Sequence, residues 1–561
     1  MQKVADADVR DGGSSTKTKS LAQIGAKGTQ PKNVSRDFDR LMKSQGYIAG
    51  IEPYEVSCLF RNTAGEICEK VVPMILPHDV CHQIYSLGKM DFLTGAPMEL
   101  EAYWGNVMHK TWFENHPHRT DVLRAPSKAI PFRLWGDDAV NTKQKSLYCI
   151  SFASTVCLRY ASLLSRFLTI AVGLGDILCL DPLFEVLAWS FEILGTGMLP
   201  LRRHDFAEFN TYSNAWKHRG KRVMGDFIAL LCEATGDLKY LVETYHFEHN
   251  YSTDSCCFKC YACKRHGPVS AYDFVDQPAW LHSRRLHSEY MHSTGGSVAA
   301  ARIPGFHLDM VSFDLMHTLH LGVLLVAIGS AFFELLELNY FGGPVTGGWG
   351  VRFSAQFRIA WEWFSAWLKR NKLSTHQAPF CVNRMSMRAF SDPPLWKGKA
   401  GENALLARFL LEHWLILAQR TSDPKHHLIA GNLWGYVRII DIAENPNVFL
   451  SEGEALELEE ARSVAFTSHS LLARASVAAS SQLWRTVPKH HYLDHLCRPN
   501  WPDSSGGKFN PGHGWCFADE DFIGRLTRIS KGRMNIKALL TKYLLRLHLL
   551  LERDSYSVPA L

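Results

Sequence analysis

The sequence lacks two features that would place it in a simple class. Its first residues, MQKVADADVRDGG, contain no apolar segment of the kind that opens a secretory signal, so we expect an intracellular protein. Charge of one sign is not in large excess either, because 61 Lys and Arg stand against 55 Asp and Glu, a net charge of +6. This balance permits nucleic-acid binding at local patches and does not require it.

Long hydrophobic runs and a disulfide pattern are also missing. The longest apolar run extends from Leu321 to Phe333 and is shorter than the roughly 20 residues of a membrane-spanning helix. We therefore expect a buried helix there, and no membrane. The 14 Cys follow no repeated spacing, which favours a reducing intracellular compartment.

The residues that are abundant indicate a large folded protein. With 561 residues, 46% of them hydrophobic, the chain can form three or four units or one core with large insertions. The 16 Trp support sizeable buried cores, and the 26 His offer metal ligation and proton transfer near neutral pH.

The chain divides into segments of different texture. Residues 1–45 are rich in Ser, Thr, Lys, Asp and Gly and are expected to form a disordered tail. Residues 46–128 are predicted to be an N-terminal helical region, because helix-like spacing follows Pro77 and continues through MELEAYWGNVMHKTWF. Residues 326–508 are predicted to be helical, residues 509–545 to form a loop and a helix, and residues 546–561 a tail.

The segment 129–325 has a β-rich start. IPFRLWGDDAV, SLYCISFAS and FLTIAVGL each read as a strand, and the amphipathic DPLFEVLAWSFEILG follows them as a helix. A further apolar run then stops at Gly236 and Asp237. The predicted order is strand, strand, strand, helix, strand.

Two acids stand at the predicted ends of strands. Asp137 lies in GDDA, and Asp237 lies in ATGDLKY. Carboxylates at such positions can hold the divalent ions that phosphodiester cleavage needs. The alternative is structural, since Gly-Asp favours turns and Asp caps helices. Further on, Asp314 and His317 in FDLMH are three residues apart. They could form a local ligand pair on one face of a helix, or they could be a capping Asp and a core His.

One cysteine cluster has the spacing of a metal site. Cys257 and Cys260 form the CxxC half of a zinc site, and Cys256 and Cys263 offer spare thiolates. Structural zinc and free thiols both remain open. The second half of the site is also open, with four histidines nearby in the sequence: His246, His249, His266 and His282.

Taken together, GDD, GDL, CCFKC and FDLMH resemble the core of eukaryotic DDE/D transposases of the CACTA type and their relatives, over about residues 130 to 530. The resemblance implies an α/β plus α fold, in which an RNase H-like mixed sheet core is interrupted by a large all-helical insertion. It implies that Asp137 and Asp237 are the first two catalytic acids. It matches Cys257 and Cys260 to the Cys pair, and Asp314 with His317 to the downstream motif.

The resemblance places the third acid on a helix after the insertion. Glu520 in WCFADEDFIGR is preferred to Glu402 in KAGENALL, with Asp519 and Asp521 as alternative ligands. An acidic helix start also suits the helix dipole without any catalytic role. The stretch PKHHYLDH resembles a His-rich segment ahead of the last acid in related proteins, with no role assigned.

The resemblance implies DNA cleavage and strand transfer with Mg²⁺ or Mn²⁺ held by Asp137, Asp237 and Glu520. It also implies a nuclear protein that binds DNA and forms a homo-oligomer. Phosphate contacts are expected from six basic residues: Arg202, Arg203, Lys217, Arg219, Lys221 and Arg222. One alternative is an inactive, domesticated relative that binds DNA. Another is a zinc-stabilised helical interaction protein with no nucleic-acid role.

Overall fold

The computed structural model describes residues 51–62, 64–142, 145–157, 165–173, 177–498, 501, 505–530 and 536–552. The predicted tail over residues 1–45 lies outside the described residues. The predicted tail over 546–561 is wrong in its first part, because helix α21 (Ile536–Glu552) continues to Glu552. Buried leucines of α21, among them Leu547 and Leu551, join the main hydrophobic core.

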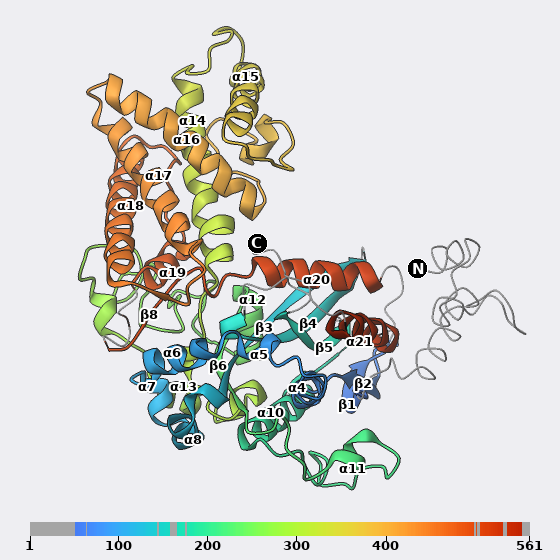
Figure 1. The fold of residues 1–561 in the computed structure, drawn as a ribbon. Coiled ribbons are helices and arrows are strands. Elements are labelled where there is room, and N and C mark those ends of the chain that lie inside the picture. The colour runs from blue at the N-terminus through green and yellow to red at the C-terminus, as the bar shows by residue number, and fades with distance from the viewer. Residues whose placement is uncertain are drawn as a thin grey trace, which may run out of the picture.

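A four-stranded mixed sheet forms the centre of the molecule (Figure 1). In space its strands are ordered β5, β4, β3, β6. Neighbours β3 and β4, and β4 and β5, are antiparallel, whereas β3 and β6 are parallel. The strands are β3 (Ala129–Thr142), β4 (Lys145–Ser154), β5 (Phe167–Gly173) and β6 (Ile228–Gly236). Helix α10 (Asp181–Thr196) lies between β5 and β6 in the chain. The predicted order of strand, strand, strand, helix, strand and the mixed α/β class are confirmed.

The sheet strands are apolar on both faces because helices cover both faces. Figure 1 shows α20 (Phe517–Ser530) above the sheet and α10 below it. Helix α10 packs on β6, and α20 packs on β3. Strand β5 accordingly reads FLTIAVG, with six of its seven residues buried.

The region 46–128 is not purely helical. A hairpin of β1 (Tyr54–Arg61) and β2 (Ile67–Met74) precedes the helices. The sequence YEVSCLFR alternates buried and exposed residues with the period of a strand, a signal that the helical interpretation missed. Five helices then follow, as predicted: α4 (Pro77–Ser86), α5 (Asp91–Thr94), α6 (Pro97–Val107), α7 (Thr111–Glu114) and α8 (Arg119–Arg124).

The segment between the sheet and α20 contains a helical unit with its own hydrophobic core. It starts with a π-helical segment, η6 (Met316–Val323), which continues into α14 (Leu324–Glu337). The helices that follow are α15 (Trp349–Arg370), α16 (Ala400–Arg420), α17 (Pro424–Ala443), α18 (Glu452–Ala478) and α19 (Pro488–Leu496). Two short strands, β7 (Phe449–Leu450) and β8 (Lys508–Phe509), pair with each other.

The apolar run from Leu321 to Phe333 begins in the last turn of η6, at a kink at Leu321, and continues through α14. Residues Met316–Glu337 are long and apolar enough to cross a membrane, but 83% of the most apolar window is buried inside the molecule. The prediction of a buried helix is confirmed.

Candidate active site and metal centre

Asp137 and Asp237 lie side by side at one edge of the sheet. The parallel register pairs Gly136 of β3 with Gly236, the last residue of β6, and an aspartate follows each of these glycines. Neighbouring strands are about 4.8 Å apart, which brings the two carboxylates to the same place. The ring of Tyr240 packs over both glycines, and a Cβ at either would lie less than 2.5 Å from it.

Asp137 does not end its strand, contrary to the prediction. Strand β3 continues to Thr142 because it remains paired with β4, and Asp137 is opposite Cys149. Only the pairing with β6 stops at Gly136, since β6 turns away into helix α12 (Leu238–Tyr245). The Gly-Asp-Asp sequence therefore lies inside a strand and does not form a turn.

Asp237 combines a capping role with its place at the site. It is the N-cap of α12, and its Oδ1 accepts a hydrogen bond of 2.6 Å from the Tyr240 backbone N–H. This bond fixes the direction of the carboxylate at the sheet edge. Asp237 can therefore cap α12 with one carboxylate oxygen and still belong to the group of acids at the sheet edge.

Glu520 of α20 reaches the same point. Its carboxyl shares a hydrogen bond with that of Asp137. Burial, the charge and hydrogen bond of Glu520 and the charge of Asp237 together raise the pKa of Asp137 to about 9. Three carboxylates from β3, β6 and α20 thus converge. Glu402 is placed elsewhere: it closes the first turn of α16, where its carboxylate accepts from the Lys399 backbone N–H.

The two acids beside Glu520, Asp519 and Asp521, form ion pairs with arginines. Asp519 is fully buried and accepts hydrogen bonds from Arg133 of β3 and, at 3.2 Å, from Arg166. It holds α20 against the sheet. Asp521 pairs at 2.6 Å with Arg525 on the outer surface of α20. Asp519 is therefore wrong as an alternative ligand. Asp521 is paired with Arg525, whereas Glu520 is the acid of the three that reaches Asp137.

Asp314 and His317 form a hydrogen-bonded pair next to Glu520. Asp314 Oδ2 accepts from His317 Nδ1 at 2.6 Å, and its Oδ1 accepts from the Cys516 backbone N–H at 3.0 Å. His317 Nε2 is 3.7 Å from Glu520 Oε1. Burial lowers the pKa of His317, but Asp314, Glu520 and Asp237 outweigh burial and raise it overall. Asp314 is therefore a cap, while His317 faces the carboxylates and is not a core residue.

The predicted basic residues lie away from this site. They surround α11 (Asn214–His218), in the segment that precedes β6, whereas the carboxylates follow its end (Figure 1). Nine strand residues separate the two ends, about 30 Å. Arg202 and Arg203 already pair with Glu208 and Asp205. That these residues contact DNA phosphates stays a prediction, and their placement puts any such contact away from the carboxylates.

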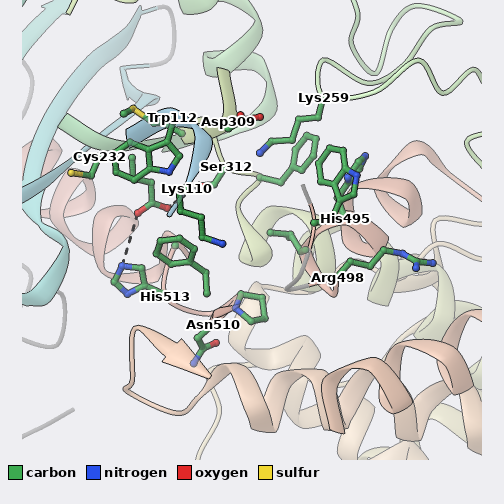
Figure 2. A pocket seen from close by; sticks show the side chains of 18 of the residues that line it. Lys110, Trp112, Cys232, Lys259, Asp309, Ser312, His495, Arg498, Asn510 and His513 are labelled. Atoms are coloured by element: carbon green, nitrogen blue, oxygen red, sulfur yellow. Dashed lines mark hydrogen bonds and ion pairs between the residues drawn. The ribbon is translucent and has the colours of Figure 1, made fainter. Parts of the chain in front are cut away.

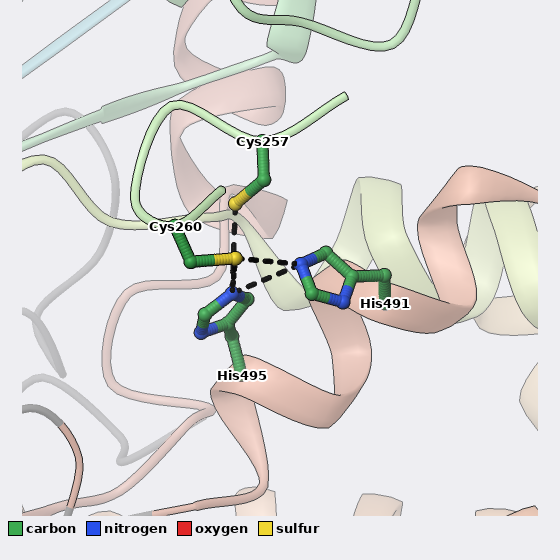
Figure 3. A group of neighbouring side chains, drawn as sticks. All are labelled: Cys257, Cys260, His491 and His495. Carbon is green, nitrogen blue, oxygen red and sulfur yellow. Dashed lines mark hydrogen bonds between the residues drawn. The ribbon is translucent and has the colours of Figure 1, made fainter. Parts of the chain in front are cut away.

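A buried cluster of two cysteines and two histidines forms a candidate metal centre (Figure 3). Cys260 Sγ lies 3.2 Å from His491 Nε2 and 3.4 Å from His495 Nε2, and the two imidazole nitrogens are 3.1 Å apart. Cys257 Sγ is 3.5 Å from His495 Nε2. Two thiols and two imidazoles are a zinc ligand set, and His491 and His495 share a face of α19 because they are four residues apart.

Electrostatics in this cysteine pair favours one thiolate, on Cys257, because burial and the neighbouring Cys257 raise the pKa of the Cys260 thiol well above its usual range. Burial raises the pKa of the Cys257 thiol, but hydrogen bonding from Cys260 and the proximity of the imidazoles set it well below its usual range. A thiolate is the form that binds zinc. The cluster can therefore hold a metal ion such as zinc.

The second half of this cluster was missed. The four histidines proposed from the sequence are not part of it, and its histidines come from PKHHYLDH, more than 200 residues later. Cys256 and Cys263 are also outside, since their thiols donate to the carbonyls of Ala262 and Tyr261. The signal in the sequence was the HxxxH spacing inside a predicted helix.

A cavity of about 170 Å³ adjoins the metal centre (Figure 2). His495 lines one side, and Glu233 of β6, which accepts from Ser312 Oγ at 2.8 Å, lines another. Lys110 and Lys259 also line it. The cavity thus separates the metal centre from β6, the strand that leads to Asp237.

No family model matches the sequence, and no curated protein matches it. The arrangement of the side chains must therefore support any assignment of function.

The shifted pKa of Asp137 predicts a pH dependence of stability. The folded chain keeps this proton up to about pH 9, whereas the unfolded chain loses it near pH 4. The folded state binds the extra proton, so the free energy of unfolding should fall as pH rises from about 4 to 9, with a slope of up to about 1.4 kcal/mol per pH unit from this group. Urea unfolding without divalent ions at pH 5 and pH 8 measures it.

The variant Asp137→Asn is the control for that measurement, because an amide does not titrate. It should remove the part of the slope that Asp137 causes, and Mg²⁺ should flatten the wild-type profile. Identical profiles for the two chains would contradict the assignment.

Proposed function

We propose that the chain is a divalent-metal-dependent enzyme that cleaves and rejoins DNA strands, with the architecture of the DDE/D transposases it resembles. The observation that carries the proposal is the convergence of Asp137, Asp237 and Glu520 from two adjacent strands and a distant helix. Structural turns and caps alone would give no reason for a helix nearly 300 residues later to deliver a third carboxylate.

We propose further that the four-stranded sheet is the centre of an RNase H-like core. An RNase H-like core has three antiparallel strands followed by a helix and a parallel fourth strand, and the order β5, β4, β3, β6 has this form. We propose that α20 completes the core and that the helical unit from η6 to α19 is an insertion into it. The separate hydrophobic core of that unit supports this division.

The donor set fits Mg²⁺ or Mn²⁺. Three carboxylates supply the hard oxygen ligands that these ions prefer, and burial together with the neighbouring carboxylates raises the pKa of Asp137. When bound, a pair of divalent ions activates the attacking water or 3′-hydroxyl and neutralises charge on the leaving oxygen.

The protein's own residues keep these ligands in place. The α12 cap orients Asp237, and the buried Arg133–Asp519 pair fixes the helix that carries Glu520. His317, oriented by Asp314, lies beside Glu520 and restrains its carboxylate. These contacts pre-organise the site, so little rearrangement is needed when the DNA phosphate arrives.

DNA is the proposed partner. We therefore also propose that the protein acts in the nucleus and that several copies assemble on paired DNA ends. The basic residues around α11 are proposed to contact the duplex away from the cut. Binding there should weaken as salt increases.

The test is a cleavage and strand-transfer assay on DNA duplexes with Mg²⁺, Mn²⁺ or neither. We expect broken strands, and products joined to a second duplex, only with the metal ions. Metal binding at the carboxylates without cleavage would identify an inactive relative. A chain that binds neither metal ions there nor DNA would be the zinc-stabilised interaction protein.

A further inference from the structure

Helix α19 contacts both the metal centre and the carboxylate site. His491 and His495 point to Cys257 and Cys260 (Figure 3). Lys489, two residues before His491, extends instead to η6, the π-helical segment that carries His317. One short helix therefore joins the cysteine loop that follows β6 to the segment beside Glu520.

The Lys489 ammonium binds an irregular turn of η6. Its Nζ donates to the carbonyl oxygens of His317 at 2.7 Å and Leu321 at 3.0 Å. Leu321 has non-helical backbone angles, φ −103° and ψ 20°, which interrupt the helical hydrogen-bond ladder at this point. The lysine thus supplies donors where the backbone bonding is irregular. Gly322 allows the close approach, since a Cβ there would lie 2.4 Å from Lys489 Cδ.

This turn determines where His317 is held. The carbonyl that Lys489 binds belongs to His317 itself, whose ring pairs with Asp314. Asp314 in turn accepts from the Cys516 backbone N–H, and the Cys516 carbonyl accepts from the Glu520 backbone N–H at 2.8 Å. A continuous series of hydrogen bonds runs from Lys489 to the residue that carries the third acid.

A second contact from α19 reaches the same segment. The ring of Tyr492 stacks on Phe313, with ring centroids 4.6 Å apart and an interplanar angle of 17°. Phe313 immediately precedes Asp314. Helix α19 therefore fixes the Asp314–His317 segment from both ends.

We infer that Lys489 is a positioning residue through which the Cys257, Cys260, His491 and His495 centre sets the geometry of the carboxylate site. This inference rests on the proposed function in assigning divalent ions to Asp137, Asp237 and Glu520. Zinc at the centre anchors α19, and α19 then places Lys489 on η6. Loss of either the zinc or the lysine releases His317 and the start of α20.

The experiment measures Mn²⁺ binding to the full-length, zinc-loaded chain by the loss of the free-ion electron paramagnetic resonance signal. Lys489→Met is expected to weaken Mn²⁺ binding roughly ten- to a hundred-fold, as for other residues that support metal ligands indirectly. The zinc content should stay the same. Chelation of zinc, followed by desalting and Mn²⁺ titration, should weaken Mn²⁺ binding to a similar extent.

The sign of the change separates positioning from charge. Lys489 is close enough to Asp314 and Asp237 to interact with their charges, so removal of its charge alone would tighten Mn²⁺ binding. Equal or tighter binding by Lys489→Met would overturn the inference. Lys425→Met is the matched control: it removes another lysine of the helical unit, one that pairs with Glu334 of α14 at 2.7 Å, and should leave Mn²⁺ binding unchanged.

Failure of the proposed function would look different. In that case the wild-type chain and Asp237→Asn would bind Mn²⁺ equally, or neither would bind it. Hydrogen exchange of the Met316–Val323 amides then decides the inference by itself. Faster exchange in Lys489→Met and in the zinc-free chain, with an unchanged rate in Lys425→Met, supports the positioning role of Lys489. An unchanged rate in Lys489→Met or in the zinc-free chain overturns it.

Discussion

Asp137→Asn is expected to reduce metal-dependent DNA cleavage on the order of a thousand-fold or more, and Glu520→Gln should do the same. Each change removes a negative ligand from a site in which two of the three carboxylates share a hydrogen bond. The amide keeps nearly the same shape, so the loss reports on charge and metal binding. Single-turnover cleavage of a labelled duplex with Mg²⁺ or Mn²⁺ measures it.

Glu402→Gln is the matched control for this prediction. Glu402 is the competing third acid in the sequence, but it closes the first turn of α16, so its replacement should change cleavage less than about two-fold. A thousand-fold loss in Glu402→Gln, with normal cleavage by Glu520→Gln, would reverse the assignment of the third acid. Equal rates for the wild type and Asp137→Asn would remove Asp137 from the mechanism.

The sheet and its acids could be predicted because their signals are local. Strands such as FLTIAVG are continuous apolar runs, and each of the two aspartates directly follows a glycine at the same register position. Their meeting in space follows from the strand order. Glu520 required the resemblance, since nothing in ADED itself distinguishes a ligand from Asp519, which forms a buried ion pair with Arg133.

Only the two cysteine ligands of the metal centre could be predicted, because its histidines are far away in the sequence. CxxC is a local pattern, but His491 and His495 lie more than 200 residues beyond it and are brought to it by tertiary packing. Histidines that are close in sequence, such as His249, were the natural candidates and were wrong. The hairpin β1–β2 was missed for a different reason: its alternation is short and adjoins a strongly helical segment.

His491→Ala is expected to destabilise the chain strongly by removing one of the four ligands. A structural zinc site supplies on the order of 10 kcal/mol to folding in small domains. Here the ion would tie the loop of Cys257 and Cys260, which follows the sheet, to α19 of the helical unit. We expect loss of bound zinc and a fall of about 10 °C or more in the unfolding temperature. Zinc content by elemental analysis and calorimetric unfolding measure these two effects.

Cys263→Ser is the matched control because Cys263 is close in sequence, is partly exposed and has its thiol on the Tyr261 carbonyl. Its replacement should leave both zinc content and unfolding temperature unchanged. The same zinc content in His491→Ala and the wild type would show that the cluster is not the zinc site. Loss of zinc without a change in stability would show that α19 is held by packing alone, and the carboxylate site would then be independent of the metal centre.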